Sequence, residues 1–165
     1  MAKCAACEST ILLGGERFHK WLFCNNDCRE KFKIGLTNEL VEPAVVAQHI
    51  REVFNAECPV CKKPGPLDCF SSTTVTGMVV AFSINSESKL CCASCGRMRR
   101  LSAFAHCLFL GWWSPKALVC NVFVLPTNLI AAAFVRVPKA PTVELINSVK
   151  ARIGESVAAK VAAQQ

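Results

Sequence analysis

Cysteine is the residue type whose spacing in this chain could do chemistry. Two pairs lie near the start, Cys4-x2-Cys7 and Cys24-x3-Cys28, and two lie further on, Cys58-x2-Cys61 and Cys92-x2-Cys95. Gaps of this size let both sulfurs of a pair face one ion, and Zn²⁺ prefers four such ligands in a tetrahedron. The sequence therefore predicts two Zn²⁺ ions, one held by Cys4, Cys7, Cys24 and Cys28 and one by Cys58, Cys61, Cys92 and Cys95.

Four of the twelve cysteines are surplus to these sites. Cys91 could replace Cys92, but only Cys92 keeps the two-residue gap to Cys95. Cys69 has no assigned role. Cys107 and Cys120 lie with His106 in apolar sequence, where packing is the expected role. Because no signal peptide precedes Cys4, we expect a reducing compartment, in which cysteines bind metal rather than form disulfides.

The elements around the first site predict a treble-clef zinc finger over residues 1–41. Ile11–Leu13 and Arg17–Phe23 are expected to form a hairpin that turns at Gly14-Gly15. A helix capped by Asn25, Asn26 or Asp27 should follow, with Cys28, Phe32 and Leu36 on one face. His19 is expected to be a solvent-facing strand residue rather than a ligand. The interspersed charges of this module, Lys31 and Lys33 included, predict a mixed solvated face.

A linker helix and a zinc ribbon are predicted next. Residues 42–57 place Val46, Ile50, Val53 and Phe54 on one stripe after Pro43, with His49 partly buried beside it. Residues 58–100 are expected to form a ribbon with two cysteine knuckles. Its strands should be Val75–Ile84, in which Met78, Val80, Phe82 and Ile84 alternate, and Lys89–Cys91. The turn is placed at Asn85–Ser88.

An apolar stretch with Lys116 as its only charge occupies most of residues 101–136. Its first segment, Leu101–Trp113, would span about 20 Å as a helix, short of a hydrocarbon core near 30 Å. Pro126 makes an uninterrupted spanning helix over Ala117–Val135 doubtful. A re-entrant or interfacial helical hairpin that bends at Gly111–Pro115 is expected, and a buried hairpin of a soluble oligomer is the alternative. The predicted membrane-associated residues are Leu101, Phe104, Leu108, Phe109, Leu110, Trp112, Trp113, Leu118, Val122, Phe123, Leu125, Leu129, Ile130 and Phe134.

The charge pattern supports a membrane. The chain carries a net charge of +7 and a mean hydropathy of +0.33. Between Glu87 and Glu144 there is no acidic residue. Basic residues near an anionic lipid surface contribute about 1 kcal/mol each. The predicted surface contacts are Arg97, Arg99, Arg100, Lys116, Arg136 and Lys139, with both ends of the hairpin on the cytoplasmic side.

Residues 137–165 are predicted to form a C-terminal amphipathic helix. Its stripe consists of Val143, Ile146, Val149, Ile153, Val157 and Val161. Lys150 and Lys160 lie in or beside this stripe, which suits cations at a membrane surface. Packing on the metal modules is equally compatible with the pattern. The predicted fold class is thus small α+β zinc modules, a treble clef plus a zinc ribbon, followed by an α-helical apolar hairpin and this helix.

The motifs together resemble a group of uncharacterised bacterial membrane-associated proteins with a GWW-containing apolar hairpin. The resemblance covers most of residues 4–135 and rests on CxxC with ILLGG, FCNNDC, CPVCKKPGPLD, CCASCG, and LFLGWW followed by PKALVCNVFVLPTNL. The first module is also similar to TRASH or MYM-type treble-clef fingers, which are linked to metal handling and protein contacts. The resemblance implies zinc and a bacterial inner membrane, but no particular activity.

The expected function is a membrane-tethered zinc scaffold or adaptor that binds an unknown protein partner. No enzyme is expected, because the chain has no HExxH, GxSxG or Gly-rich phosphate loop and complete Cys4 shells leave zinc no open position. One alternative is nucleic-acid binding by the ribbon through Lys89, Arg97, Arg99 and Arg100. The other is a metal or redox sensor that uses Cys69, Cys91, Cys107 or Cys120, one of which would have to be exposed and acidic.

Overall fold

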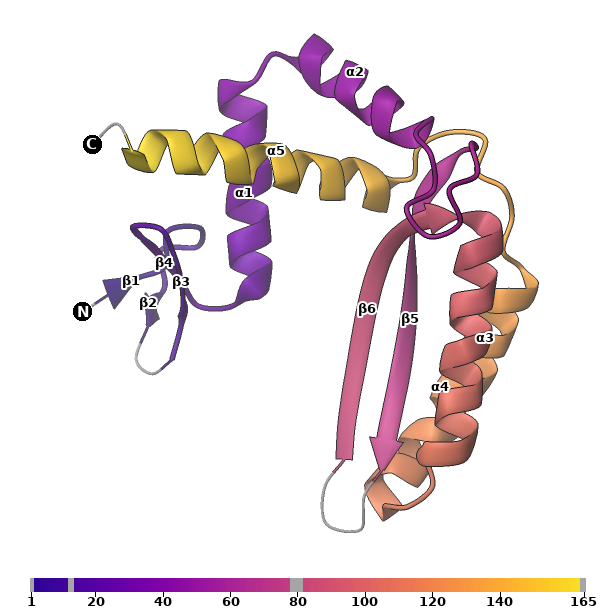
Figure 1. Cartoon of the computed structure of the whole chain (residues 1–165). Coiled ribbons are helices and arrows are strands. Elements are labelled where there is room, and N and C mark those ends of the chain that lie inside the picture. The colour runs from indigo at the N-terminus through magenta and orange to yellow at the C-terminus, as the bar shows by residue number, and fades with distance from the viewer. Residues whose placement is uncertain (1, 12–13, 78–81, 164–165) are drawn as a thin grey trace. The chain divides into compact units, whose positions relative to one another are not determined.

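The computed structural model describes residues 2–11, 14–77 and 82–163 (Figure 1). The chain divides into two compact units. The first consists of Met1–Val53 and Val143–Gln165, and the second of Phe54–Thr142. The end of the chain therefore folds with its beginning, and each unit contains one group of four predicted ligands.

Two short antiparallel pairs of strands open the first unit. β1 (Ala2–Lys3) pairs with β2 (Thr10–Ile11), and β3 (Glu16–Phe18) pairs with β4 (Trp21–Phe23). The hairpin turn lies at His19-Lys20, so its predicted position at Gly14-Gly15 is wrong. Both glycines have positive φ, 75° and 103°, and they turn the chain between the two sheets instead. His19 has a φ of 52° in the turn and is exposed.

Helix α1 (Asn26–Leu40) begins where the sequence predicts, because the Oδ1 of Asn25 accepts a hydrogen bond from the Cys28 N–H at 2.9 Å. The ring of Phe32 packs 5.1 Å from Trp21 and 5.2 Å from Phe23, which fixes the helix on the hairpin. Helix α2 (Pro43–Phe54) follows. His49 lies on its exposed side, 3.4 Å from the Glu52 carboxylate, so the prediction that it is partly buried is wrong.

The last helix, α5 (Val143–Ala163), packs on α1. The hydroxyl of Thr37 donates to the carbonyl of Lys150 at 2.7 Å. The helices are so close at Gly154 that a Cβ there would lie 2.0 Å from the carbonyl oxygen of Lys33. Of the two placements that the sequence left open for this helix, packing on a metal module is the one observed.

The buried side of α5 differs from the predicted stripe. Val143 is exposed, and the residues that become buried are mostly small: Leu145, Val149, Ala151, Gly154 and Ala158. Close helix packing selects small residues, which a search for large apolar ones does not find. The same contact buries Lys33, which was expected to be solvated. Its Nζ lies 2.6 Å from Glu30 and 3.6 Å from Glu155.

A long β-hairpin forms one layer of the second unit. β5 (Leu67–Gly77) pairs antiparallel with β6 (Phe82–Cys92), from Leu67 opposite Cys92 to Gly77 opposite Phe82. The predicted strand Val75–Ile84 and the predicted turn at Asn85–Ser88 are therefore wrong, since residues 85–88 lie inside β6. The described side chains from Ser83 to Lys89 are all exposed. Because this part of the strand buries no side chains, it can consist mostly of polar residues, which are also typical of turns. Met78 and Val80 lie outside the described residues.

Two antiparallel helices form the other layer. α3 (Ala93–Leu110) and α4 (Pro115–Ala133) pack on each other and on β5 (Figure 1). The bend between them lies at residues 111–114, as predicted. However, α3 begins at Ala93, so the boundary predicted between the ribbon and the apolar hairpin falls inside one helix.

Helix α4 is continuous through Pro126, and the predicted interruption is wrong. Proline removes one backbone donor from a helix. Beside it, the Thr127 hydroxyl donates to the carbonyl of Phe123 at 2.6 Å. The next residue, Asn128, donates to the carbonyl of Thr73 in β5 at 2.8 Å, which ties α4 to the sheet.

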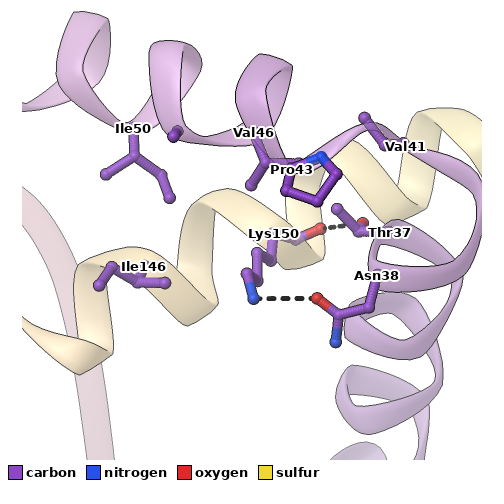
Figure 2. A pocket seen from close by; sticks show the side chains of 9 residues that line it. Thr37, Asn38, Val41, Pro43, Val46, Ile50, Ile146 and Lys150 are labelled. Carbon is purple, nitrogen blue, oxygen red and sulfur yellow. Dashed lines mark hydrogen bonds between the residues drawn. The ribbon is translucent and has the colours of Figure 1, made fainter.

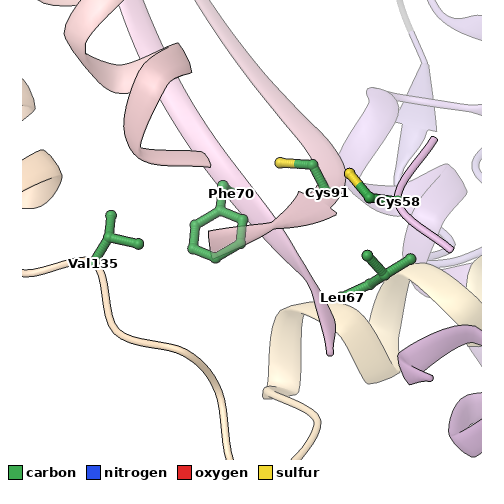
Figure 3. Close-up of a cluster of buried hydrophobic side chains, with 5 residues drawn as sticks. All are labelled: Cys58, Leu67, Phe70, Cys91 and Val135. Atoms are coloured by element: carbon green, nitrogen blue, oxygen red, sulfur yellow. The ribbon is translucent and has the colours of Figure 1, made fainter. Parts of the chain in front are cut away.

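Apolar packing in the second unit is divided between its two ends. Near the cysteines, Leu67, Phe70, Cys91 and Val135 cluster with Cys58 (Figure 3). Gly96 in α3 makes this packing possible, because a Cβ there would lie 2.5 Å from the ring of Phe70. A smaller cluster of Val75, Cys107 and Ala117 joins β5 to both helices further along.

Candidate metal centres

The first centre is formed by the four cysteines predicted for it. The Sγ atoms of Cys4, Cys7, Cys24 and Cys28 all lie within 4.8 Å of one another. Cys7 Sγ is 3.7 Å from Cys24 Sγ, and Cys24 Sγ is 3.3 Å from Cys28 Sγ. Cys4 is buried, whereas Cys7 and Cys24 are exposed. This cluster therefore has one side open to solvent.

The second centre contains Cys58, Cys61, Cys92 and Cys95, whose sulfurs also lie within 4.8 Å of one another. Cys61 Sγ is 3.6 Å from Cys92 Sγ. Cys58 is buried and the other three are half-buried, so this cluster is better covered than the first. The second pair does not form the predicted knuckle. Cys92 ends β6, and Cys95 lies in the first turn of α3.

The first pair of each centre has the same backbone geometry. The N–H of Glu8 donates to the carbonyl of Cys4, and the N–H of Lys62 donates to the carbonyl of Cys58, at 2.9 and 2.8 Å. Glu8 and Lys62 have nearly equal positive φ values, 60° and 58°. In each unit a hairpin and a helix that carries the last ligand follow this turn. The two centres are thus built by the same order of elements.

Backbone N–H groups favour ionisation of the first cysteine in each centre. Burial alone raises the pKa of Cys4, but the N–H groups of Ala6, Cys24 and Cys7 outweigh it and lower this pKa to about 6. In the same way, burial raises the pKa of Cys58, and the N–H groups of Cys61, Cys92 and Val60 lower it to about 6. Thiolates are the form that binds metal.

The last cysteine of each centre behaves oppositely. The neighbouring sulfur of Cys24, followed by burial, raises the pKa of Cys28 to about 12. Burial, followed by the sulfur of Cys61, raises the pKa of Cys95. Four thiolates repel one another at this separation, and a divalent cation among them would remove that penalty.

The sulfurs of each cluster lie close enough together to surround one metal ion. Four sulfurs at about 2.3 Å from a zinc ion lie about 3.8 Å from one another. The distances of 3.3 to 3.7 Å between neighbouring sulfurs are close to this value. Both clusters could therefore hold a metal ion.

The remaining cysteines and His106 lie outside both clusters. Cys91 points into the apolar cluster of Figure 3, where burial raises its pKa to about 11. Cys107 is fully buried, with its sulfur 3.2 Å from the Val75 N–H. His106 Nε2 lies 2.9 Å from the Thr76 hydroxyl. Cys69 and Cys120 are half-buried.

Three of the arginines predicted to face lipid hold the second unit together. Arg97 and Arg100 donate to the carbonyls of Val135 and Ala131, at 3.1 and 2.8 Å, and thereby stabilise the C-terminal end of α4. Arg99 donates to Ser72 and, at 2.7 Å, to Glu87, whose pKa it lowers. Lys116, Arg136 and Lys139 are exposed. The guanidinium groups of Arg97, Arg99 and Arg100 therefore form hydrogen bonds within the second unit. The distribution of charge along the sequence did not indicate this role.

Most of the predicted membrane-associated residues are exposed and form what we call the apolar face. In α4 the buried residues Ala117, Asn121, Asn128 and Ala132 recur at helical spacing on the side toward α3 and β5, so the exposed apolar ones occupy the opposite side. Phe104 and Leu125 are half-buried. The apolar face consists of Leu101, Leu108, Phe109, Leu110, Trp112, Trp113, Leu118, Val122, Phe123, Leu129, Ile130 and Phe134. Val119, which is 59% exposed in α4, was not among the predicted membrane-associated residues.

In length and composition, α4 alone among the described helices could cross a membrane, and 22% of its apolar window is buried. A helix in the core of a soluble protein can have the same length and composition. Neither a protein-family model, nor a curated protein, nor a solved structure matches the chain. The two clusters and the apolar face are the features of this chain that indicate a function.

Proposed function

We propose that this chain is a non-enzymatic zinc scaffold that lies on the cytoplasmic face of a membrane and presents its metal modules to a protein partner. The observation that carries the proposal is the apolar face, which begins on the same helix that supplies Cys95. Exposed apolar patches larger than a few hundred Å² are rare on soluble monomers and mark membrane or protein contacts.

The metal in both centres is Zn²⁺, because four thiolates in a tetrahedron are its preferred structural shell. Both modules are treble clefs in this proposal, the second one in place of the predicted ribbon. The shared turn geometry at Glu8 and Lys62, and the helix that follows each hairpin, support this assignment.

The hairpin lies in the plane of the membrane surface rather than across it. Because α4 is tied to β5, a crossing by α4 would carry the β-hairpin into the bilayer. β6 exposes Glu87, Lys89 and three serines, and such groups are costly in hydrocarbon. With the helices toward lipid and β6 toward water, the exposed apolar side chains face the membrane and the exposed polar side chains face the solvent. Lys116, Arg136 and Lys139 are free to meet anionic headgroups in this arrangement.

Nucleic-acid binding and redox sensing have weaker support. Arg99 and Arg100 donate to groups of their own unit. Cys91 and Cys107 are buried, and a raised pKa makes Cys91 a poor nucleophile.

Flotation with lipid vesicles tests the proposal. The zinc-loaded full-length chain should float with vesicles that contain anionic lipid, and less of it should float at high salt. Replacing Phe109, Trp113, Phe123 and Phe134 together with serine should abolish flotation. The matched control replaces Leu40, Val45 and Val143, which are exposed apolar residues of the first unit, with serine and should float normally. A wild-type chain that stays in the dense fraction as a soluble oligomer would contradict the proposal.

A further inference from the structure

A cavity of about 360 Å³ lies in the first unit among α1, α2 and α5 (Figure 2). Small-molecule sites in proteins start at about 300 Å³. Its walls are aliphatic, from Val46 and Ile50 on α2 and from Ile146 on α5. Val46 and Ile50 extend from α2 toward α5 in Figure 2, so the space is bounded by apolar side chains from both helices.

Polar groups gather at one side of this cavity. The Lys150 ammonium donates to the Oδ1 of Asn38 at 2.9 Å, and the Thr37 hydroxyl donates to the carbonyl of Lys150. An ammonium group has three donors, and the bond to Asn38 uses one. The Asn38 amide also carries an NH₂ group. Positive charge and N–H donors therefore meet an aliphatic space, which is the combination that a carboxylate with a hydrocarbon tail would match.

The sequence does not signal this site. Lys150 was expected in or beside an apolar stripe that faces either a membrane or the metal modules. In the structure α5 packs on α1 through its small residues and leaves Ile146 in the wall of the cavity. Helices α1 and α5 pack closely on each other, whereas α2 does not pack closely on either of them. A gap remains between them because of this difference in packing.

We propose that this cavity binds a small amphiphilic carboxylate of the medium-chain fatty-acid class, with its head at Lys150 and Asn38 and its chain between Ile50 and Ile146. The site is independent of the zinc centres and of the apolar face. A ligand there would fill the space under α2 and hold this helix on the first unit.

The test uses octanoate as the probe and isoleucine methyl NMR of the zinc-loaded full-length chain. Octanoate should shift the methyl signals of Ile50 and Ile146 in a saturable way. Ile130, on the apolar face, reports nonspecific adsorption and should not follow the same curve. Octan-1-ol, which has the chain without the charge, should bind at least tenfold more weakly.

Two variants distinguish the contribution of the Lys150 charge to binding from that of the cavity volume. Lys150→Met keeps the aliphatic stem and should weaken octanoate binding about tenfold, since a hydrogen bond to a charged group is lost. Lys160→Met, an exposed lysine of the same helix, is the matched control and should bind normally. Ala47→Leu should fill the cavity and abolish binding while the chain remains folded.

Equal affinity for octanoate and octan-1-ol, or an unchanged affinity in Lys150→Met, would overturn the assignment of an acid. Shifts at Ile130 alone, or none at Ile50 and Ile146, would show that the cavity is only a packing gap. None of these outcomes bears on flotation, so this inference and the proposed function fail separately.

Discussion

Cys91 and Cys92 are neighbours in the sequence but have different surroundings. Cys92 Sγ lies in the second metal centre, whereas Cys91 is 2% exposed within an apolar cluster. We predict that Cys92→Ser lowers the zinc content from two equivalents to one, as measured by elemental analysis. Cys91→Ser should retain both ions and lower the free energy of unfolding by roughly 1–3 kcal/mol, because its hydroxyl would be buried without a good partner. Loss of zinc from Cys91→Ser alone would show that the ligand is misassigned.

The two centres should also differ in how readily they react. Cys7 and Cys24 are exposed, whereas no ligand of the second centre is fully exposed. We predict that a limiting amount of chelator followed by an alkylating reagent modifies Cys7 and Cys24 before Cys61 and Cys92. Peptide mass spectrometry over a time course measures this order. Simultaneous modification of both centres would mean that metal loss unfolds the whole chain in one step.

At the element scale, the contact of α1 with α5 depends on Gly154. Its missing side chain leaves room for the Lys33 carbonyl, and a Cβ would lie 2.0 Å from that oxygen. We predict that Gly154→Ala lowers the free energy of unfolding by roughly 1–3 kcal/mol, the usual cost of overpacking. Chemical denaturation of the zinc-loaded protein measures the change.

Gly35 provides the control, because it lies inside α1 and a Cβ there would meet nothing within 4 Å. Gly35→Ala should raise the stability by about 0.5–1 kcal/mol through helix propensity. If both substitutions stabilise the protein, α5 does not pack on α1 as described.

Sequence patterns predicted the elements correctly where residues close in the sequence determine the start or end of an element. The cap at Asn25, the start of α2 at Pro43 and the bend before Pro115 are local features, and each lies where predicted. The predicted positions of the hairpin turns were wrong because the pairing of a strand depends on the strand opposite to it as well as on its own sequence. Nothing in residues 85–88 reveals that they lie opposite Ser71–Thr74, since a strand exposed on its surface can be as polar as a turn.

At the scale of the whole molecule, the metal centres were the more predictable part. The geometry of a metal site directly constrains the spacing between its cysteine ligands in the sequence. The ligands can therefore be predicted correctly even where the strands between them are predicted wrongly. The return of α5 to the first unit and the bonds of Arg97 and Arg100 to α4 were not predictable, because both depend on contacts between distant segments. The same contacts show which face of the apolar hairpin remains exposed.

The depth of the apolar face in a bilayer distinguishes a hairpin on the membrane surface from a helix that crosses the membrane. Trp113 lies just before α4, Phe123 lies within it and Phe134 lies just after it, and all three are exposed. A single tryptophan is placed at each position in turn, with Trp21 and Trp112 and, where needed, Trp113 replaced by phenylalanine, and its depth is measured by quenching with lipids labelled along their acyl chains. We predict that all three tryptophans lie at the same shallow depth. A tryptophan at position 123 that lies much deeper than the other two would show that α4 crosses the membrane, and quenching at none of the three would show that the face is covered by protein instead.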